Sequence, residues 1–263
     1  MRLYKTRVVP AVLTILGLTI IIIALWYQLG RRAVYDIASD EYNRLRDIQS
    51  PKRVAVVFPS HSEDIRRPDN AALDHEPEER DGSGQTANHV NALASINPDY
   101  IGWIKIPGTV VDYPVVQGVD NGVYLNTLFS GETNAAGAIF MDARCEEGFD
   151  APICVLYGHN MKDGSMFAQV KRFLDKKLIE DNPDIIISTD HGEELIYQAY
   201  AARRTDAWDE VYSIDFTDIE AARERIPETP KGASRLLILS TCLSGADKDA
   251  RALVFAALIS NEE

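Results

Sequence analysis

The sequence predicts a mainly β domain with peripheral helices, built as a closed barrel or a sandwich and preceded by an apolar N-terminal helix. Short apolar segments, several of them rich in β-branched and aromatic residues, recur with turn residues between them beyond residue 91. Eight such segments in one domain favour a barrel or a sandwich over a parallel α/β sheet. The expected strands are 101–106, 110–116, 138–142, 152–158, 184–189, 194–202, 235–241 and 252–258.

Two helical inserts interrupt the strand series. Residues 165–177 place Met166, Val170 and Leu174 on one face at helical spacing, and residues 218–225 form a second, shorter candidate. The peripheral helices are therefore expected between the fourth and fifth strands and before the seventh.

The composition limits both the number of domains and the class of partner. A chain of 263 residues allows one sizeable domain with accessory segments. Its formal net charge of −13 argues against nucleic acid as a partner, because binding phosphates requires clustered Lys and Arg.

The apolar N-terminal run extends from Val8 to Leu29 without a charged side chain. Crossing a bilayer core takes about 20 apolar residues, and this run is long enough. A cleaved signal peptide is the alternative, but its apolar region is shorter and ends at a small-residue cleavage site that is not evident here. We expect an uncleaved anchor; basic residues flank the run on both sides, so the charge pattern says little about its orientation.

The segment after the anchor changes character twice. Residues 32–49 have helical apolar spacing, and residues 59–88 are rich in Asp, Glu, Pro, Gly and Ser without an aromatic side chain. The predicted organisation is a cytoplasmic tip and transmembrane anchor (1–30), a juxtamembrane helix with an acidic flexible linker (31–90), and a catalytic β domain (91–263).

Three side chains carry the candidate chemistry. His159 follows the apolar strand 152–158, Cys242 ends the strand 235–241, and Arg251 lies nine positions later at the start of the last strand. A neighbouring imidazole or guanidinium can raise the thiolate fraction of a cysteine, and a fixed arginine can stabilise the oxyanion formed when a thiolate attacks an amide carbonyl. Taken singly, each residue is more often structural, so the prediction depends on the three converging.

The other cysteines leave two alternatives open. Cys145 and Cys154 could pair across neighbouring strands, although the sequence does not show that they do. The three cysteines and His159 lack the paired C-x-x-C or H-x-x-x-H spacing of zinc sites, so a metal site would need an unusual arrangement. We expect neither a metal nor an organic cofactor.

Several ordered motifs resemble the signature segments of sortases, the cell-surface cysteine transpeptidases of mainly Gram-positive bacteria. LSTC at 239–242 with Arg251 downstream and YGHNM at 157–161 resemble the family in general. The finer pattern resembles class B, and the similarity extends over roughly residues 92–259. The class B motifs are INPDYIGWIKIPGT (96–109), VDYPVVQ (111–117), DNGVYLN (120–126), GAIFMD (137–142) and GHNMKDGSMF (158–167).

The resemblance implies a fold and a set of roles. It implies an eight-stranded sortase-type β-barrel with Cys242 as nucleophile, His159 as general acid/base and Arg251 as oxyanion or substrate-positioning group. It also implies that Asn121, Leu125, Ser240 and Thr241 line the substrate groove.

The implied reaction cleaves a C-terminal sorting signal after Thr and passes the acyl group through a thioester to a primary amine. The implied partners are the sorting-signal peptide of a secreted surface protein and an amine from a peptidoglycan precursor or a pilin lysine. The expected location is the cell membrane, with a single-pass anchor and an extracellular catalytic domain. A membrane-tethered cysteine protease or hydrolase and a non-catalytic peptide-binding barrel remain as alternatives.

Overall fold

A computed structural model describes residues 5–49, 92–181, 184–226, 228–245 and 247–259. Within these residues eight strands close into a barrel with the order β1-β2-β3-β4-β7-β8-β6-β5. All eight expected strands are present, which confirms the predicted fold class. Their bounds are β1 (Tyr100–Lys105), β2 (Asp112–Val116), β3 (Ile139–Met141), β4 (Ile153–Tyr157), β5 (Asp184–Thr189), β6 (Glu194–Asp206), β7 (Ala233–Cys242) and β8 (Ala250–Ile259).

The strand directions decide which loops share a rim of the barrel. β4 runs parallel to β7, and β2 runs parallel to β3, while the other neighbouring pairs are antiparallel. The ends of β4, β6 and β7 therefore lie at the same rim as the starts of β2, β3 and β8. The turn between β5 and β6 lies at the opposite rim.

The β4–β7 pair lies between β3 and β8 in the barrel wall and is buried on both faces. Six consecutive residues of β7, from Leu236 to Thr241, are buried, and the first four residues of β4 are buried as well. Strands covered on both sides read as continuous apolar runs instead of alternating ones, which explains the sequence pattern of these two strands.

Short helices connect the strands of the barrel, and one long helix, α1, precedes them. The 3-10 helices are η1 (Val123–Leu125), η2 (Gly148–Asp150), η3 (Phe167–Leu174) and η4 (Glu210–Ser213); the α-helices are α1 (Lys5–Gln49), α3 (Lys176–Asp181) and α4 (Ile219–Ala222), and residues 92–96 are also helical. The second predicted insert corresponds to α4, where the carboxylate of Asp218 caps the helix by accepting from the Ala221 N–H.

The first predicted insert differs from expectation in its period. Phe167, Val170 and Phe173 are buried at a spacing of three residues, as a 3-10 helix requires, and Leu174 is 36% exposed. The α-helical spacing that placed Leu174 on the apolar face was therefore wrong. The three-residue spacing buries both phenylalanine side chains almost completely.

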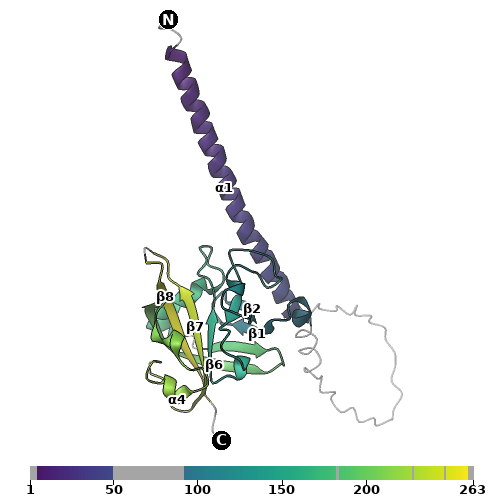
Figure 1. The fold of residues 1–263 in the computed structure, drawn as a ribbon, viewed down its shortest axis with the longest axis vertical. Coiled ribbons are helices and arrows are strands. Elements are labelled where there is room, and N and C mark those ends of the chain that lie inside the picture. The colour runs from purple at the N-terminus through teal and green to yellow at the C-terminus, as the bar shows by residue number, and fades with distance from the viewer. Residues whose placement is uncertain (1–4, 50–91, 182–183, 227, 246, 260–263) are drawn as a thin grey trace, which may run out of the picture.

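Helix α1 is continuous through both N-terminal segments that the sequence indicated separately (Figure 1). Its apolar part is long enough and apolar enough to cross a membrane, and the large hydrophobic side chains from Leu13 to Leu29 are exposed in the isolated protein. Its second half packs on the barrel through Ala38, Tyr42 and Leu45, which recur at helical spacing and are buried. The linker predicted at 59–88 lies outside the described residues.

Candidate active site

His159 and Cys242 are brought together by the parallel pairing of β4 with β7. Tyr157 pairs with Ser240, the Gly158 N–H donates to the Ser240 carbonyl at 3.2 Å, and the Thr241 hydroxyl donates to the Gly158 carbonyl at 2.8 Å. One further step along both chains places His159 beside Cys242. Parallel neighbours end at the same rim of a sheet, so the two side chains need no long loop to meet.

Gly158 is required at this junction by packing. A Cβ atom on Gly158 would lie 2.5 Å from Ile139 Cδ1 and 2.6 Å from Phe167 Cγ. Such distances are shorter than any normal carbon–carbon contact, so only glycine allows the chain to turn here and present His159 at the rim.

Cys242 and Arg251 occupy opposite positions of the β7–β8 ladder. The register pairs Cys242 with Arg251, and the Leu243 N–H donates to the Ala250 carbonyl at 2.9 Å just beyond the pair. Directly opposed residues of antiparallel strands project from the same face with Cβ atoms about 5 Å apart. Cys242 is partly exposed although the six preceding residues of β7 are buried.

The His159 ring is oriented by a backbone acceptor. Its Nε2 lies 2.7 Å from the Leu125 carbonyl oxygen, at the end of η1. A carbonyl only accepts, so this contact requires the hydrogen of the imidazole to be on Nε2.

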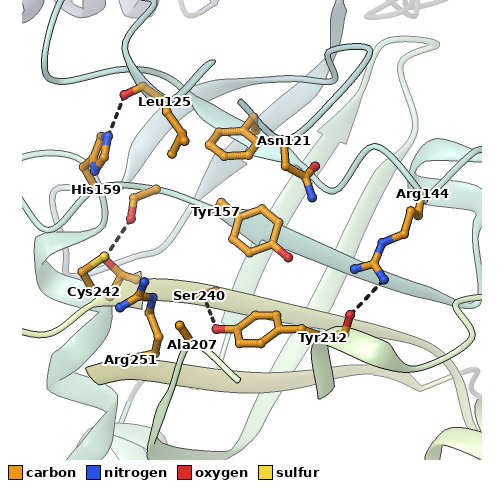
Figure 2. Close-up of a pocket in the computed structure, with 13 residues that line it drawn as sticks. Asn121, Leu125, Arg144, Tyr157, His159, Ala207, Tyr212, Ser240, Cys242 and Arg251 are labelled. Carbon is orange, nitrogen blue, oxygen red and sulfur yellow. Dashed lines mark hydrogen bonds between the residues drawn. The ribbon is translucent and has the colours of Figure 1, made fainter. Parts of the chain in front are cut away.

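A cavity of about 370 Å³ opens at this rim and is shown in Figure 2. All seven residues that the sequence nominated border it, and they come from four separate stretches of the chain. The lining residues are Asn121, Leu125, Phe140, Arg144, Tyr157, Gly158, His159, Ala207, Tyr212, Ser240, Thr241, Cys242 and Arg251.

Three of the nominated groove residues use their polar groups within the protein. The Asn121 side-chain oxygen accepts from the Ala143 N–H at 2.8 Å, and the Ser240 hydroxyl shares a 2.8 Å hydrogen bond with the Tyr212 hydroxyl. Thr241 is bonded to Gly158, as described above, and both Ser240 and Thr241 are buried. Their hydrogen bonds fix the walls of the cavity in place.

The wall opposite His159 is built around a buried carboxylate that the sequence argument missed. The side chain of Asp142 is fully buried and forms a 2.8 Å ion pair with Arg144, while the Tyr157 hydroxyl donates to the same carboxylate at 2.8 Å. Arg144 also donates to the Tyr212 carbonyl at 2.8 Å, and the rings of Tyr157 and Tyr212 stack with centroids 6.3 Å apart. No sequence signal marks Tyr212, because it lies in a loop helix far from both motifs.

The titration of this wall follows from its contacts. Burial of the Asp142 carboxyl favours its neutral form, but hydrogen bonds from Arg144 and Tyr157 outweigh that effect and hold its pKa below the usual value. Burial raises the pKa of Tyr157, and the Asp142 charge raises it further. Near neutral pH the wall therefore consists of a carboxylate, a guanidinium and two neutral phenols.

Cys145 and Cys154 are both free and buried, whereas Cys242 is the cysteine that borders the cavity. The Cys154 thiol donates to the Gly148 carbonyl at 3.1 Å, and the neighbouring Cys145 together with burial raises the pKa of Cys154 well above its ordinary value. A thiol held neutral in this way is a poor nucleophile.

Among the described residues, the side chains close enough to share a metal ion are Asp150, His191 and Glu193. All three are exposed, and Asp150 already forms a 3.1 Å ion pair with Arg235. None of the cysteines belongs to this group, and it lies at the rim opposite Cys242.

Comparison with known proteins identifies the family. Residues 104–259 match the family model described as a sortase domain. Sortase B of Listeria monocytogenes is 31% identical over 170 residues, which is 61% of this chain and 69% of that protein. Sortase B of Staphylococcus aureus is 26% identical over 258 residues, which is 94% of this chain and 96% of that protein.

The solved structures agree with the sequence comparison. The X-ray structure of Clostridium perfringens sortase B is 30% identical, with a TM-score of 0.57 over 64% of this chain and 97% of that one. A Staphylococcus aureus sortase B–substrate complex is 30% identical, with a TM-score of 0.57 over 66% of this chain and 86% of that one. The chain therefore belongs to the sortase family of cysteine transpeptidases, as a class B sortase.

Proposed function

We propose that Cys242 is the nucleophile of this transpeptidase, that His159 is its general acid and base, and that Arg251 stabilises the oxyanion. The observation that supports these roles is the meeting of a partly exposed thiol, an oriented imidazole and a guanidinium around one cavity. Cys145 and Cys154 offer no comparable surroundings, because both are buried away from the cavity.

The proposed reaction proceeds by acyl transfer through a covalent intermediate. The Cys242 thiolate attacks the carbonyl carbon of the substrate threonine and forms a tetrahedral oxyanion, whose charge Arg251 offsets. The C–N bond then breaks, and protonated His159 gives its proton to the departing amine, leaving a thioester. A primary amine attacks this thioester, His159 accepts the amine proton, and the Cys242 thiolate is released with a new amide bond.

The proposed donor is a C-terminal sorting signal cleaved after Thr, and the proposed acceptor is an amine of a peptidoglycan cross-bridge or a pilin lysine. Leu125, Phe140 and the two stacked tyrosines give the cavity mainly apolar walls, which suit an extended peptide whose side chains occupy shallow subsites. Asn121, Leu125, Ser240 and Thr241 are proposed to border the peptide.

The proposed location is the outer face of the cell membrane. α1 provides one span that is long and apolar enough to cross the bilayer, and sortases are cell-surface enzymes. We propose that this span crosses once, with residues 1–30 forming the cytoplasmic tip and anchor and residues 91–263 forming the catalytic domain outside.

The roles are tested by replacing the nucleophile. Cys242→Ala should abolish both peptide cleavage and capture of the thioester, because no other accessible thiol borders the cavity among the described residues. Cys145→Ala is the matched control, since it removes a buried thiol and should keep turnover per folded molecule. Retained cleavage by a folded Cys242→Ala enzyme would overturn the assignment.

The acceptor is tested by competition between an amine and water. Adding primary amines to the peptide reaction should convert hydrolysed product into ligated product, as detected by mass spectrometry. A protease would give hydrolysis alone at every amine concentration. A binding barrel would leave the peptide intact and Cys242 unreactive toward alkylating reagents.

A further inference from the structure

The second half of α1 is fastened to the barrel by hydrogen bonds along its length. The Asn134 side-chain amide donates to the Val34 carbonyl at 3.0 Å. Two turns further along, the carboxylate of Glu41 accepts from the Ser130 N–H at 2.9 Å and from the Ser130 hydroxyl at 2.7 Å. Both barrel partners lie in the loop that leads into β3.

Tyr42 and Arg46 add buried contacts to the same docking surface. The Tyr42 hydroxyl donates to the Gly137 carbonyl at 2.6 Å, and its ring meets the edge of Tyr113 with centroids 5.1 Å apart. Arg46 Nε donates to the Asp112 carbonyl at 2.8 Å, and its guanidinium lies 4.8 Å from the Tyr113 ring centroid. Buried aromatic contacts of this kind hold a helix in one orientation, whereas exposed ion pairs contribute too little to do so.

These docking partners lie at the rim that carries the active site. Asp112 begins β2, and residues 130–137 lead into the start of β3. The start of β3 lies beside the end of β4, because the two strands are antiparallel, and the end of β4 is followed by His159. Figure 1 shows the same relation: the turn joining β7 to β8 and the N-terminal end of α1 lie toward one side, and the C-terminus lies toward the other.

Little chain separates the apolar span from the docked half. The span ends at Leu29, the first docking contact is at Val34, and α1 is helical throughout. At 1.5 Å of rise per residue, the two are separated by about 8 Å along the axis. A continuous helix transmits the orientation of one end to the other, unlike a flexible linker.

Residues 50–91 join the half of α1 that is docked on the barrel to the start of the barrel domain itself. Gln49 ends the docked half of α1, and the helical segment 92–96 buries Leu93. The connection between membrane and barrel therefore runs through α1, and the length of 50–91 does not set their separation.

We propose that docked α1 holds the active-site rim against the lipid headgroup layer, so that the bilayer surface itself is a partner surface of the catalytic domain. The proposal rests on the membrane anchoring proposed above. It identifies the accessible substrates as peptides and amines presented close to the membrane, within reach of a cavity that faces it.

The test measures which rim lies nearer the bilayer. A fluorescent donor is incorporated as a non-canonical residue at Lys248, in the β7–β8 turn, or at His191, in the β5–β6 turn; both residues are exposed. The full chain is reconstituted into nanodiscs that contain an acceptor dye on lipid headgroups. The ten residues of β7 separate the rims by about 33 Å, so energy transfer should be severalfold stronger from Lys248 than from His191.

Two insertions of about a dozen Gly and Ser residues serve as matched variants. Placed between Gly30 and Arg31, the insertion breaks the continuous helix and should abolish the difference between the two labels. Placed between Pro68 and Asp69, the same insertion should leave the difference unchanged. The proposal is overturned if energy transfer in the parent chain is equal from the two labels, stronger from His191, or absent from both. It is also overturned if only the insertion between Pro68 and Asp69 abolishes the difference.

The same samples separate this proposal from the proposed function. Energy transfer requires no turnover, so Cys242→Ala should keep the difference between Lys248 and His191. Cleavage of a soluble peptide by that variant would reject the catalytic assignment and leave the docking result intact. If energy transfer from Lys248 and His191 is equal while the parent chain still ligates peptides, the proposed orientation toward the membrane is rejected and the catalytic assignment stands.

Discussion

Arg251 stands directly across the β7–β8 ladder from Cys242, and its guanidinium donates to the Lys248 and Ala250 carbonyls at 3.0 and 3.1 Å. The turn between the two strands thus holds the arginine beside the thiol. Turning its side chain toward a substrate would exchange two hydrogen bonds with neutral backbone carbonyls for bonds to a charged oxyanion, in which both partners are ionised.

Arg251→Ala should lower kcat by about 10²–10³, as loss of an oxyanion donor does in other acyl-transfer enzymes. Arg251→Lys should recover only part of this loss, because an ammonium lacks the planar fork of a guanidinium. Steady-state peptide cleavage measures the effect, and the melting temperature serves as the control and should change little. Unchanged kcat in the alanine variant would exclude the oxyanion role.

Asn160 should behave as a positioning residue that ties the His159 loop to the Cys242 loop. Its amide donates to the Ser244 hydroxyl at 3.0 Å, and Lys171 Nζ donates to its side-chain oxygen at 3.0 Å. We expect Asn160→Ala to lower kcat more than it raises KM and to shift the pH profile of kcat/KM, because the imidazole loses its fixed placement.

A double-mutant cycle of Asn160→Ala with Ser244→Ala provides the check. The two losses should be non-additive by about 0.5–3 kcal/mol, because both variants break the same hydrogen bond. If the losses of the two single variants add strictly and the pH profile of Asn160→Ala equals that of the parent, Asn160 has no positioning role.

Gly158→Ala should destabilise the fold by about 1–3 kcal/mol and reduce turnover, because the added methyl group overlaps Ile139 and Phe167. Gly30→Ala is the matched control, since no atom lies within 4 Å of the methyl group that it would add. Chemical denaturation compares the two variants. If both variants have the same free energy of unfolding, the residues around the end of β4 can move to accommodate the added methyl group.

Asp142→Asn should cost about 1–3 kcal/mol of folding free energy, because a fully buried carboxylate loses its charge-assisted bonds to Arg144 and Tyr157. The folded-state pKa of Asp142 is lowered, so its contribution to stability is present above the unfolded-state pKa of about 3.9 and declines as the pH falls through the lower folded value.

The measurement is thermal unfolding of both proteins from pH 7 down to pH 3. The stability gap between wild type and Asp142→Asn should be widest near neutral pH and narrow below about pH 4. A gap that stays constant with pH would mean that the loss comes from packing and not from the charge.

The strands were predictable because they are short, apolar and separated by turn residues, and each predicted strand overlaps an observed one. Their order was not predictable from periodicity. The parallel neighbours β4 and β7 are separated in the chain by β5, β6 and their connections, and alternation along a strand contains no information about its partner. The 3-10 period of η3 was not predicted either. Met166 and Leu174 fit the apolar face of an α-helix as well as Phe167 and Phe173 fit the apolar face of the observed 3-10 helix.

The candidate site was predictable where a reactive residue ended an apolar strand, as His159 and Cys242 do. Arg144 and Tyr212 have no such signal, because their role depends on the buried carboxylate of Asp142, which joins them in space. The class B resemblance implied that Ser240 and Thr241 line the substrate groove, but it could not show that their hydroxyl groups are bonded to Tyr212 and Gly158.

The burial of β7 limits which parts of the active site can change in sequence without loss of stability. From Leu236 to Thr241 the strand is enclosed by protein, so changes there are felt first as lost stability. The cavity walls contributed by Asn121, Leu125 and Ala207 belong to loops and to the short helix η1, outside the ladder. New preferences for peptides can therefore arise by exchanging these loops, while the strand that presents the thiol stays untouched.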